Sequence, residues 1–232
     1  GVTNEDLHDV VFINATTGII VGDNGRVYRS TNGGTVWAQQ TSGVTGNLRT
    51  VTFGAGGMVY AAGVDGMTIR STNNGVNWSS VSTGSTRYRG SSAVGSKVWL
   101  AGDGGIITAS INSGANFTLQ TTSTASDFHG IFMLNETVGF AGGQNDMLLY
   151  TNNGGASWTS RNTGIFQTAN AIHFPESNMG VVVCELGAIY RTTNTGVTWV
   201  NDNSGTATEF NDVHFPSTSR GWTVGVGGVI KY

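Results

Sequence analysis

The chain has 232 residues, of which 11% are charged, and a formal net charge of -3 at pH 7. A chain of this length can bury a sizeable core in one domain without disulfides or a structural metal. The weakly acidic balance excludes a basic nucleic-acid-binding surface, and no apolar run approaches the roughly 20 residues of a membrane span. The single Cys184 cannot form an internal disulfide, so cysteine usage leaves the compartment open.

The first thirty residues predict three short strands. Residues 7–12 (LHDVVF) are rich in β-branched and aromatic types, as in a strand. Residues 18–22 (GIIVG) are nearly all apolar, which suits a strand buried on both faces. The dipeptide Asn24-Gly25 is a strong hairpin signal, and residues 26–30 (RVYRS) supply the third strand.

These three predicted strands, which we call the preamble, are followed by the stretch STNGGTVW at residues 30–37. This stretch is expected to form a turn that leads to a fourth strand beginning near Trp37. The stretch recurs four times, and its closing aromatic residues lie 41, 39, 41 and 41 residues apart. A fixed period of about 40 residues indicates a repeat architecture. The copies are expected at residues 7–47, 48–87, 88–127, 128–168 and 169–209, with a partial copy at 210–232.

Four antiparallel strands in about 40 residues describe a β-propeller blade, which packs against its neighbours because it cannot cover its own two faces. The sequence therefore predicts an all-β fold, a single β-propeller domain over residues 1–232 with six blades of four strands. The partial copy stops at Tyr232, the counterpart of Arg29, so the sixth blade is expected to lack its outer strand. The alternative is that the chain is part of a seven-bladed ring.

The motif S/T-x-N-x-G-x-x-W resembles the Asp-box of bacterial neuraminidase repeats. Together with its preamble it is similar to the propeller family that includes the photosystem II assembly factor. Asparagine stands where that box usually has aspartate, and either side chain can bond its own turn. The resemblance implies a structural box, with its amide oxygen bonded to turn N–H groups and its aromatic ring packed beneath. The box residues are Asn32, Trp37, Asn73, Trp78, Asn112, Phe117, Asn153, Trp158, Asn194 and Trp199.

In propellers of this connectivity, the loops entering the first strand and those joining the second to the third share one face around the channel mouth. This face is the default binding site. Polar residues recur at the second position of the first strands, and acidic residues recur in the second-to-third turns. The segment STRYRG in the third copy adds a basic patch for an acidic partner or a glycan. The channel-face binding candidates are His8, Asp9, Arg49, Arg87, Arg89, His129, Asn170, Asn211 and Asp212.

Two enzymatic hypotheses can be weighed against repeat position. Asp9 and Asp212 could supply the two carboxylates of a glycoside hydrolase, but they share one repeat position, which favours a structural hydrogen bond. A sialidase gathers three arginines on a substrate carboxylate. Arg29, Arg70 and Arg191 instead hold one repeat position in three different blades, which indicates a scaffold role. No catalytic residue is predicted.

The histidines and aromatic residues also have structural interpretations. His8 and His129 belong to the first and fourth blades, too far apart for zinc, whose ligands lie about 2 Å from one point. His173 and His214 share a position inside the first strand, where a packed and hydrogen-bonded core histidine is expected. Trp99 and Trp222 share a second-strand position and are expected to pack between blades. No metal and no cofactor are predicted.

The sequence thus predicts a non-enzymatic, secreted or surface propeller that acts as a protein-recognition or assembly scaffold. One alternative is a structural subunit of a surface appendage or virion that uses the open blade edge, Gly228 to Tyr232. A glycan-binding or glycan-hydrolysing propeller is the other. The expected partner is a protein or a second copy, with a glycan as the alternative and no nucleic acid. The expected location is extracellular or at the cell surface, or else the periplasm or thylakoid lumen.

Overall fold

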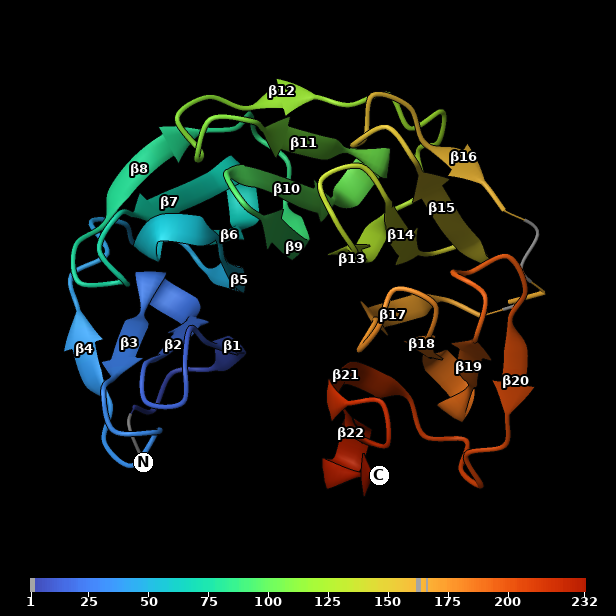
Figure 1. The fold of residues 1–232 in the computed structure, drawn as a ribbon. Coiled ribbons are helices and arrows are strands. Elements are labelled where there is room, and N and C mark those ends of the chain that lie inside the picture. Colours follow the sequence, from blue (N-terminus) through green and yellow to red (C-terminus); the bar gives the residue numbers. More distant parts are fainter. Residues whose placement is uncertain (1–2, 162–163, 166) are drawn as a thin grey trace. The chain divides into compact units, whose positions relative to one another are not determined.

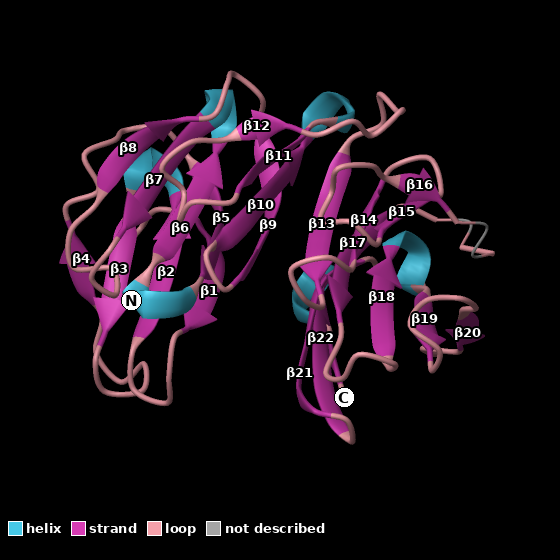
Figure 2. Ribbon diagram, turned by 45° about the horizontal axis from the view of Figure 1, so that its top comes forward, coloured by secondary structure: helices cyan, strands magenta, loops and turns pink. Residues whose placement is uncertain are grey.

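The computed structural model describes residues 3–161, 164–165 and 167–232. Their strands form six antiparallel sheets, five with four strands and a last one with three, each in chain order (Figures 1 and 2). The prediction of an all-β, six-bladed propeller whose sixth blade has three strands is confirmed. The chain divides into two compact units of three blades each, Gly1–Gln120 and Thr121–Tyr232.

Unit 1 holds the first three blades, whose strands run antiparallel throughout. Blade 1 consists of β1 (Leu7–Phe12), β2 (Gly18–Gly22), β3 (Val27–Ser30) and β4 (Ala38–Gln40). Blade 2 consists of β5 (Leu48–Phe53), β6 (Val59–Gly63), β7 (Met67–Ser71) and β8 (Ser79–Ser82). Blade 3 consists of β9 (Tyr88–Val94), β10 (Lys97–Gly102), β11 (Ile107–Ser110) and β12 (Thr118–Leu119).

Unit 2 holds the remaining three blades. Blade 4 consists of β13 (Phe128–Met133), β14 (Gly139–Gly143), β15 (Met147–Thr151) and β16 (Thr159–Ser160). Blade 5 consists of β17 (Ala169–His173), β18 (Gly180–Cys184), β19 (Ile189–Thr192) and β20 (Val200–Asp202). Blade 6 consists of β21 (Phe210–Ser217), β22 (Arg220–Gly225) and β23 (Ile230–Lys231).

Short 3-10 turns connect strands within the blades. Asn24 and Gly25 both have positive φ, 55° and 67°, as the hairpin signal at this dipeptide predicts. The turns are η1 (Asp23–Gly25), η2 (Ala55–Gly57), η3 (Val64–Gly66), η4 (Asp103–Gly105), η5 (Glu185–Gly187) and η6 (Val226–Gly228). In the part of the chain that the structure describes, no helix has the length and apolar character needed to cross a membrane.

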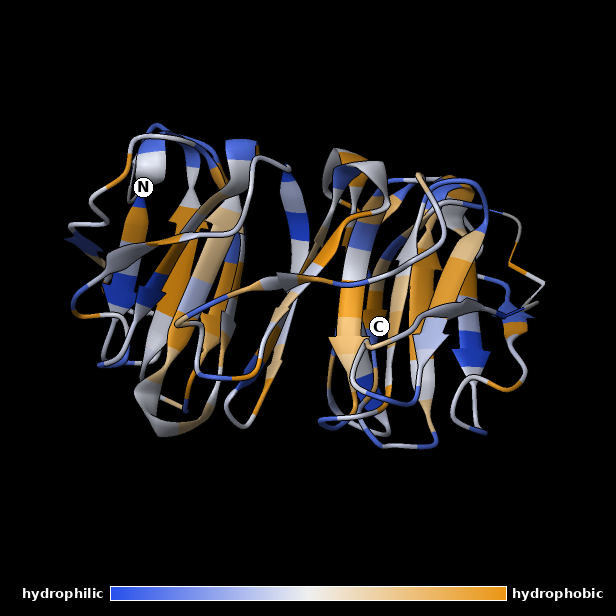
Figure 3. Cartoon of the chain, turned by 90° about the horizontal axis from the view of Figure 1, so that it is seen from above, coloured by the Kyte–Doolittle hydropathy of each residue, from blue (hydrophilic) through white to orange (hydrophobic). Residues whose placement is uncertain are grey.

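The core of each unit lies around the second strands. Every residue of β6, β14 and β18 is buried, as expected for a strand covered on both faces. Figure 3 shows hydrophobic residues concentrated along strands of both units and hydrophilic residues in many connecting segments. Trp99 in β10 is 1% exposed, whereas its counterpart Trp222 in β22 is 46% exposed. Trp99 thus has the burial expected of inter-blade packing, whereas Trp222 is half exposed, although it lines an apolar cavity together with Val181 and Ile189 of blade 5.

Each box turn is held by the same three hydrogen bonds. In the first, Ser30 Oγ donates to Asn32 Oδ1 (3.0 Å), Gly34 N donates to Ser30 Oγ (2.9 Å), and Val36 N donates to Asn32 Oδ1 (2.9 Å). The asparagine oxygen thus holds the turn, as the resemblance to the Asp-box implies. Equivalent bonds form in the boxes of Asn73, Asn112, Asn153 and Asn194.

The box glycine allows the turn to pack against the preceding blade. Gly75 has φ +76°, and a Cβ there would lie 2.3 Å from Cδ1 of Ile19 in blade 1. A side chain at this position would therefore be strained and would also separate the two blades. Gly114 and Gly196 make the same close approach to Tyr60 and Phe140.

Candidate binding face

Each first strand carries a β-bulge at its second position. In blade 1, Leu7 pairs with Gly22 and Asp9 pairs with Val21, so His8 is the extra residue. A bulge bends its strand and re-aims a side chain, and bulges are frequent beside functional sites. The same register shift recurs in all six blades, and we call the six extra residues the bulge residues: His8, Arg49, Arg89, His129, Asn170 and Asn211.

In unit 1, the first strands β1 and β5 lie side by side and bring two bulge residues together. His8 Nε2 lies 2.6 Å from Asp23 Oδ1, in the turn of its own blade. Arg49 Nη1 lies 3.2 Å from His8 Nδ1, and Arg49 Nη2 lies 3.9 Å from Asp23 Oδ1. Because arginine can only donate, His8 Nδ1 accepts and Nε2 carries the proton that is donated to Asp23. This arrangement fits the neutral imidazole.

The third blade extends this group with two more arginines. Arg89 Nε donates to Asp103 Oδ1 at 2.5 Å, and Arg87 Nε lies 3.9 Å from Asp103 Oδ2. These side chains are partly solvated, with 33% of Arg89 and 49% of Arg87 exposed. With Arg49, three guanidinium groups thus lie near two carboxylates, Asp23 and Asp103.

In unit 2, the bulge residues His129 and Asn170 belong to a hydrogen-bond network that includes one carboxylate. His129 Nδ1 donates to Asn170 Oδ1 at 3.0 Å, and Asn170 Nδ2 donates to the Phe210 carbonyl at 2.8 Å and to Glu209 Oε1 at 3.1 Å. Asn211 is exposed. This network links the first strands of three blades, β13, β17 and β21, but supplies no guanidinium group.

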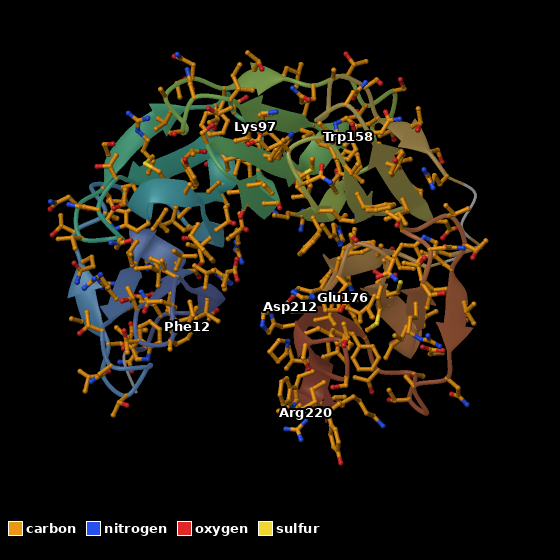
Figure 4. The ribbon with its side chains drawn as sticks, viewed as in Figure 1. Phe12, Lys97, Trp158, Glu176, Asp212 and Arg220 are labelled. Atoms are coloured by element: carbon orange, nitrogen blue, oxygen red, sulfur yellow. The ribbon has the colours of Figure 1, made fainter. Side chains whose placement is uncertain are left out.

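The two aspartates that follow bulge residues, Asp9 and Asp212, each bind backbone. Asp9 accepts from Val10 N and from Val51 N of the next blade, both at 2.7 Å, so it ties blade 1 to blade 2. Asp212, labelled in Figure 4, accepts from Val213 N at 2.8 Å. Desolvation raises the pKa of Asp212 against the lowering effects of this bond and of His214. More than a third of the surface of Asp212 is exposed, so water screens this carboxylate.

The arginines that share the third-strand position lie apart from the bulge residues. Arg29 Nε donates to the Asn74 carbonyl at 2.8 Å, and Arg70 Nη1 donates to the Ser113 carbonyl at 3.1 Å. Each therefore binds the box turn of the following blade. Arg191 pairs instead with Asp202 of its own blade at 2.9 Å.

The expectation of hydrogen-bonded core histidines is wrong for His173 and His214. Within the described residues, His173 Nδ1 is buried without a hydrogen-bond partner, and His214 is exposed. Their rings pack against each other with centroids 4.9 Å apart, and His173 also contacts Phe132 and Phe215. Burial, assisted by repulsion from His214, lowers the pKa of His173 to about 4. Aromatic packing has taken the place of the expected hydrogen bonds.

Across residues 3–161, 164–165 and 167–232, no group of three or more histidine, cysteine or acidic side chains is placed to hold an ion. His8 and His129 belong to different units, and each is bonded to a neighbouring polar residue. What sequence reasoning missed is the bulge, because no residue type marks it.

Residues 2–94 match the family model described as photosynthesis system II assembly factor YCF48. A solved structure of YCF48 from Cyanidioschyzon merolae is 17% identical (TM-score 0.62; 98% of this chain, 95% of that chain). A structure of YCF48 bound to D1 peptide is 16% identical (TM-score 0.55; 98% and 93%). None of the curated proteins compared with the chain matches it.

Enzymes also share the fold. An ancestral GH74 enzyme is 15% identical, with a TM-score of 0.77, and the match covers 98% of this chain but 36% of that chain. At such identity the likeness shows the fold alone. The family model that matches residues 2–94 is that of an assembly factor.

Proposed function

We propose that the chain is a YCF48-like β-propeller and a non-enzymatic scaffold that recognises another protein. The ligand is an extended acidic segment, bound along the bulge residues of unit 1. The observation that carries the proposal is the placement of Arg49 and Arg89 at successive bulges, with Arg87 beside them. The solved complex of YCF48 with D1 peptide supports a peptide as the ligand.

The charge and exposure of the arginines support an acidic ligand. Arg87 is half exposed and lies 3.9 Å from its carboxylate, which leaves its interaction with Asp103 weak and screened by water. A guanidinium group has five N–H donors and binds a carboxylate in a bidentate fashion. A ligand carboxylate can therefore bind Arg87 and Arg49 without breaking a buried ion pair.

The existing contacts also prepare the face for binding. The bond from Arg49 to His8, and that from His8 to Asp23, hold the arginine against the first strands. Preorganised side chains lose less conformational entropy when a ligand binds. The bulge residues are therefore expected to change little between the free and bound states.

The test uses a labelled D1 peptide and an array of extended peptides that differ in their number of Asp and Glu residues. Affinity is expected to rise with acidic content and to fall at least tenfold in the double variant Arg49→Ala/Arg89→Ala. Arg29→Ala/Arg191→Ala is the matched control, because it also removes two positive charges, from partly exposed third-strand arginines that bind the scaffold. Equal binding by the double variant and the control would exclude the proposed face.

We further propose that the protein works outside the cytoplasm, at a cell surface or in a periplasmic or lumenal space. The low charge of the chain and its abundance of Gly, Ser, Thr and Asn support this location. Fractionation of cells that produce the protein with its native flanking sequence tests it. Recovery with cytoplasmic markers would exclude it.

A further inference from the structure

Among the bulge residues of unit 1, one imidazole has an acid at one ring nitrogen and a base at the other. His8 Nε2 lies 2.6 Å from Asp23 Oδ1, and His8 Nδ1 lies 3.2 Å from Arg49 Nη1. All three side chains are partly exposed to water, which can supply a proton to the ring. A ligand carboxylate that binds Arg49 therefore lies close to a group that can change its charge.

The contact between His8 and Arg49 requires a neutral imidazole. A guanidinium group has donors and no acceptor, so Nδ1 of His8 must present its lone pair to Arg49. A protonated imidazole carries a hydrogen on both nitrogens. Protonation of His8 therefore replaces the hydrogen bond to Arg49 by repulsion, while the contact with Asp23 becomes an ion pair.

The other charged groups around β1 have their own surroundings. Before β1, Glu5 lies 3.9 Å from Arg26, and Asp6 is exposed. Asp9 of β1 accepts from two backbone N–H groups, and β2 has no charged residue.

Only one of these groups belongs to a class that titrates between pH 5.5 and pH 7.5. Carboxylates ordinarily titrate near pH 4 and guanidinium groups above pH 12, whereas imidazoles titrate near neutral pH. His8 is the only histidine among residues 1–120. A change in the charge of the bulge residues of unit 1 in this pH range is therefore expected to come from His8.

We propose that His8 couples the binding of the acidic segment to pH, and that the segment binds more tightly when His8 is protonated. The inference rests on the recognition function proposed above. Protonation releases Arg49 from the ring and places a second positive charge beside it, so a ligand carboxylate meets two cationic groups in place of one. Coupling of this kind is reciprocal, so binding of the segment favours protonation of His8 and takes up protons.

The probe is a tetramethylrhodamine-labelled peptide of four aspartate-serine repeats, whose carboxylates stay ionised above pH 5. Fluorescence anisotropy at constant ionic strength is expected to show binding at least threefold tighter at pH 5.5 than at pH 7.5. Isothermal titration calorimetry at pH 6.5, in two buffers with different ionisation enthalpies, is expected to show proton uptake. Equal affinity at the two pH values, or weaker binding at pH 5.5, would overturn the proposal.

The variant His8→Gln separates protonation from hydrogen bonding. Glutamine keeps a donor for Asp23 and an acceptor for Arg49, but it gains no proton in this pH range. The variant is expected to bind the peptide equally at pH 5.5 and pH 7.5, and circular dichroism checks its fold at both. His214→Gln is the matched control, because it removes an exposed imidazole from unit 2 and should keep the pH dependence. The same pH dependence in His8→Gln and in the original protein would overturn the proposal.

A measurement without peptide tests the link between His8 and Arg49. The Nε–Hε nuclear magnetic resonance signal of Arg49 is expected to shift as the pH falls from 7.5 to 5.5, and this shift should be absent in His8→Gln. An Arg49 signal that does not respond to pH in the original protein would overturn the proposal. Absence of peptide binding at both pH values would overturn the recognition function and this proposal with it, whereas binding without pH dependence would overturn this proposal alone.

Discussion

Aspartate and histidine side chains of the first strands have different partners in different blades. Asp9 and Asp212 share a repeat position, yet Asp9 bonds to the next blade while Asp212 bonds to its own backbone. His8 is bonded at both ring nitrogens, whereas His173 is packed among rings. Residue type alone does not predict which partner each of these side chains has. The partner depends on which atoms the neighbouring strand places beside it.

Asp9→Ala tests the tie between blades 1 and 2. The substitution leaves the N–H groups of Val10 and Val51 without their acceptor, and should lower the free energy of unfolding by about 1–3 kcal/mol. Urea denaturation measures the change. Asp6→Ala, whose side chain is exposed, is the control and should be neutral. Equal stability of the two variants would show that the tie contributes nothing.

His173 should make the protein sensitive to acid. Its folded-state pKa of about 4 lies below the ordinary value of 6.5, so between these pH values the unfolded chain binds more protons. Stability is therefore complete above pH 6.5 and falls as the pH drops towards 4, by at most about 3 kcal/mol. Urea denaturation at pH 7.5 and pH 5 measures the loss.

His173→Phe supplies the control for that titration. Phe132 holds the same first-strand position in blade 4 and already packs in this group of rings, so phenylalanine should fit. The variant is expected to lose less stability between pH 7.5 and pH 5 than the original protein. An unchanged loss would assign the acid sensitivity to other groups.

At the scale of the element, the box turn and the third strand hold neighbouring blades together. The asparagine oxygen closes the turn, and the turn's glycine approaches the preceding blade. The arginine of that blade binds a carbonyl of the same turn, as Arg70 does with Ser113. The recurrence of the box is therefore explained by its structural role in the turn and at the contact between blades, and no ligand is needed to explain it.

Two substitutions of Asn73 distinguish the role of its amide oxygen from that of its amide nitrogen. Asn73→Asp keeps an oxygen that accepts from Ser71 Oγ and Asn77 N, whereas Asn73→Ala removes it. The alanine variant should lose about 1–2 kcal/mol of stability and the aspartate variant much less. Thermal unfolding of both compares them. A larger loss with aspartate would contradict the structural account of the box.

At the scale of the molecule, the repeat made the blades predictable from sequence. The period located six copies, and the end of the last copy at Tyr232 predicted its three strands. The bulge residues were predicted as a set because they share a repeat position, but the bulge itself was not predicted. A bulge depends on strand register, and residues as different as His8, Arg49 and Asn170 occupy it. The bonds between them depend on packing between blades.

The proposed recognition function is tested most directly by the Nε–Hε nuclear magnetic resonance signals of the arginines during titration with an acidic peptide. The account predicts that the signals of Arg49, Arg87 and Arg89 shift together and saturate. Those of Arg29 and Arg191, which bind the scaffold, should stay in place. Shifts confined to Arg29 and Arg191, with Arg49 and Arg89 unchanged at saturation, would contradict the assignment of the binding face.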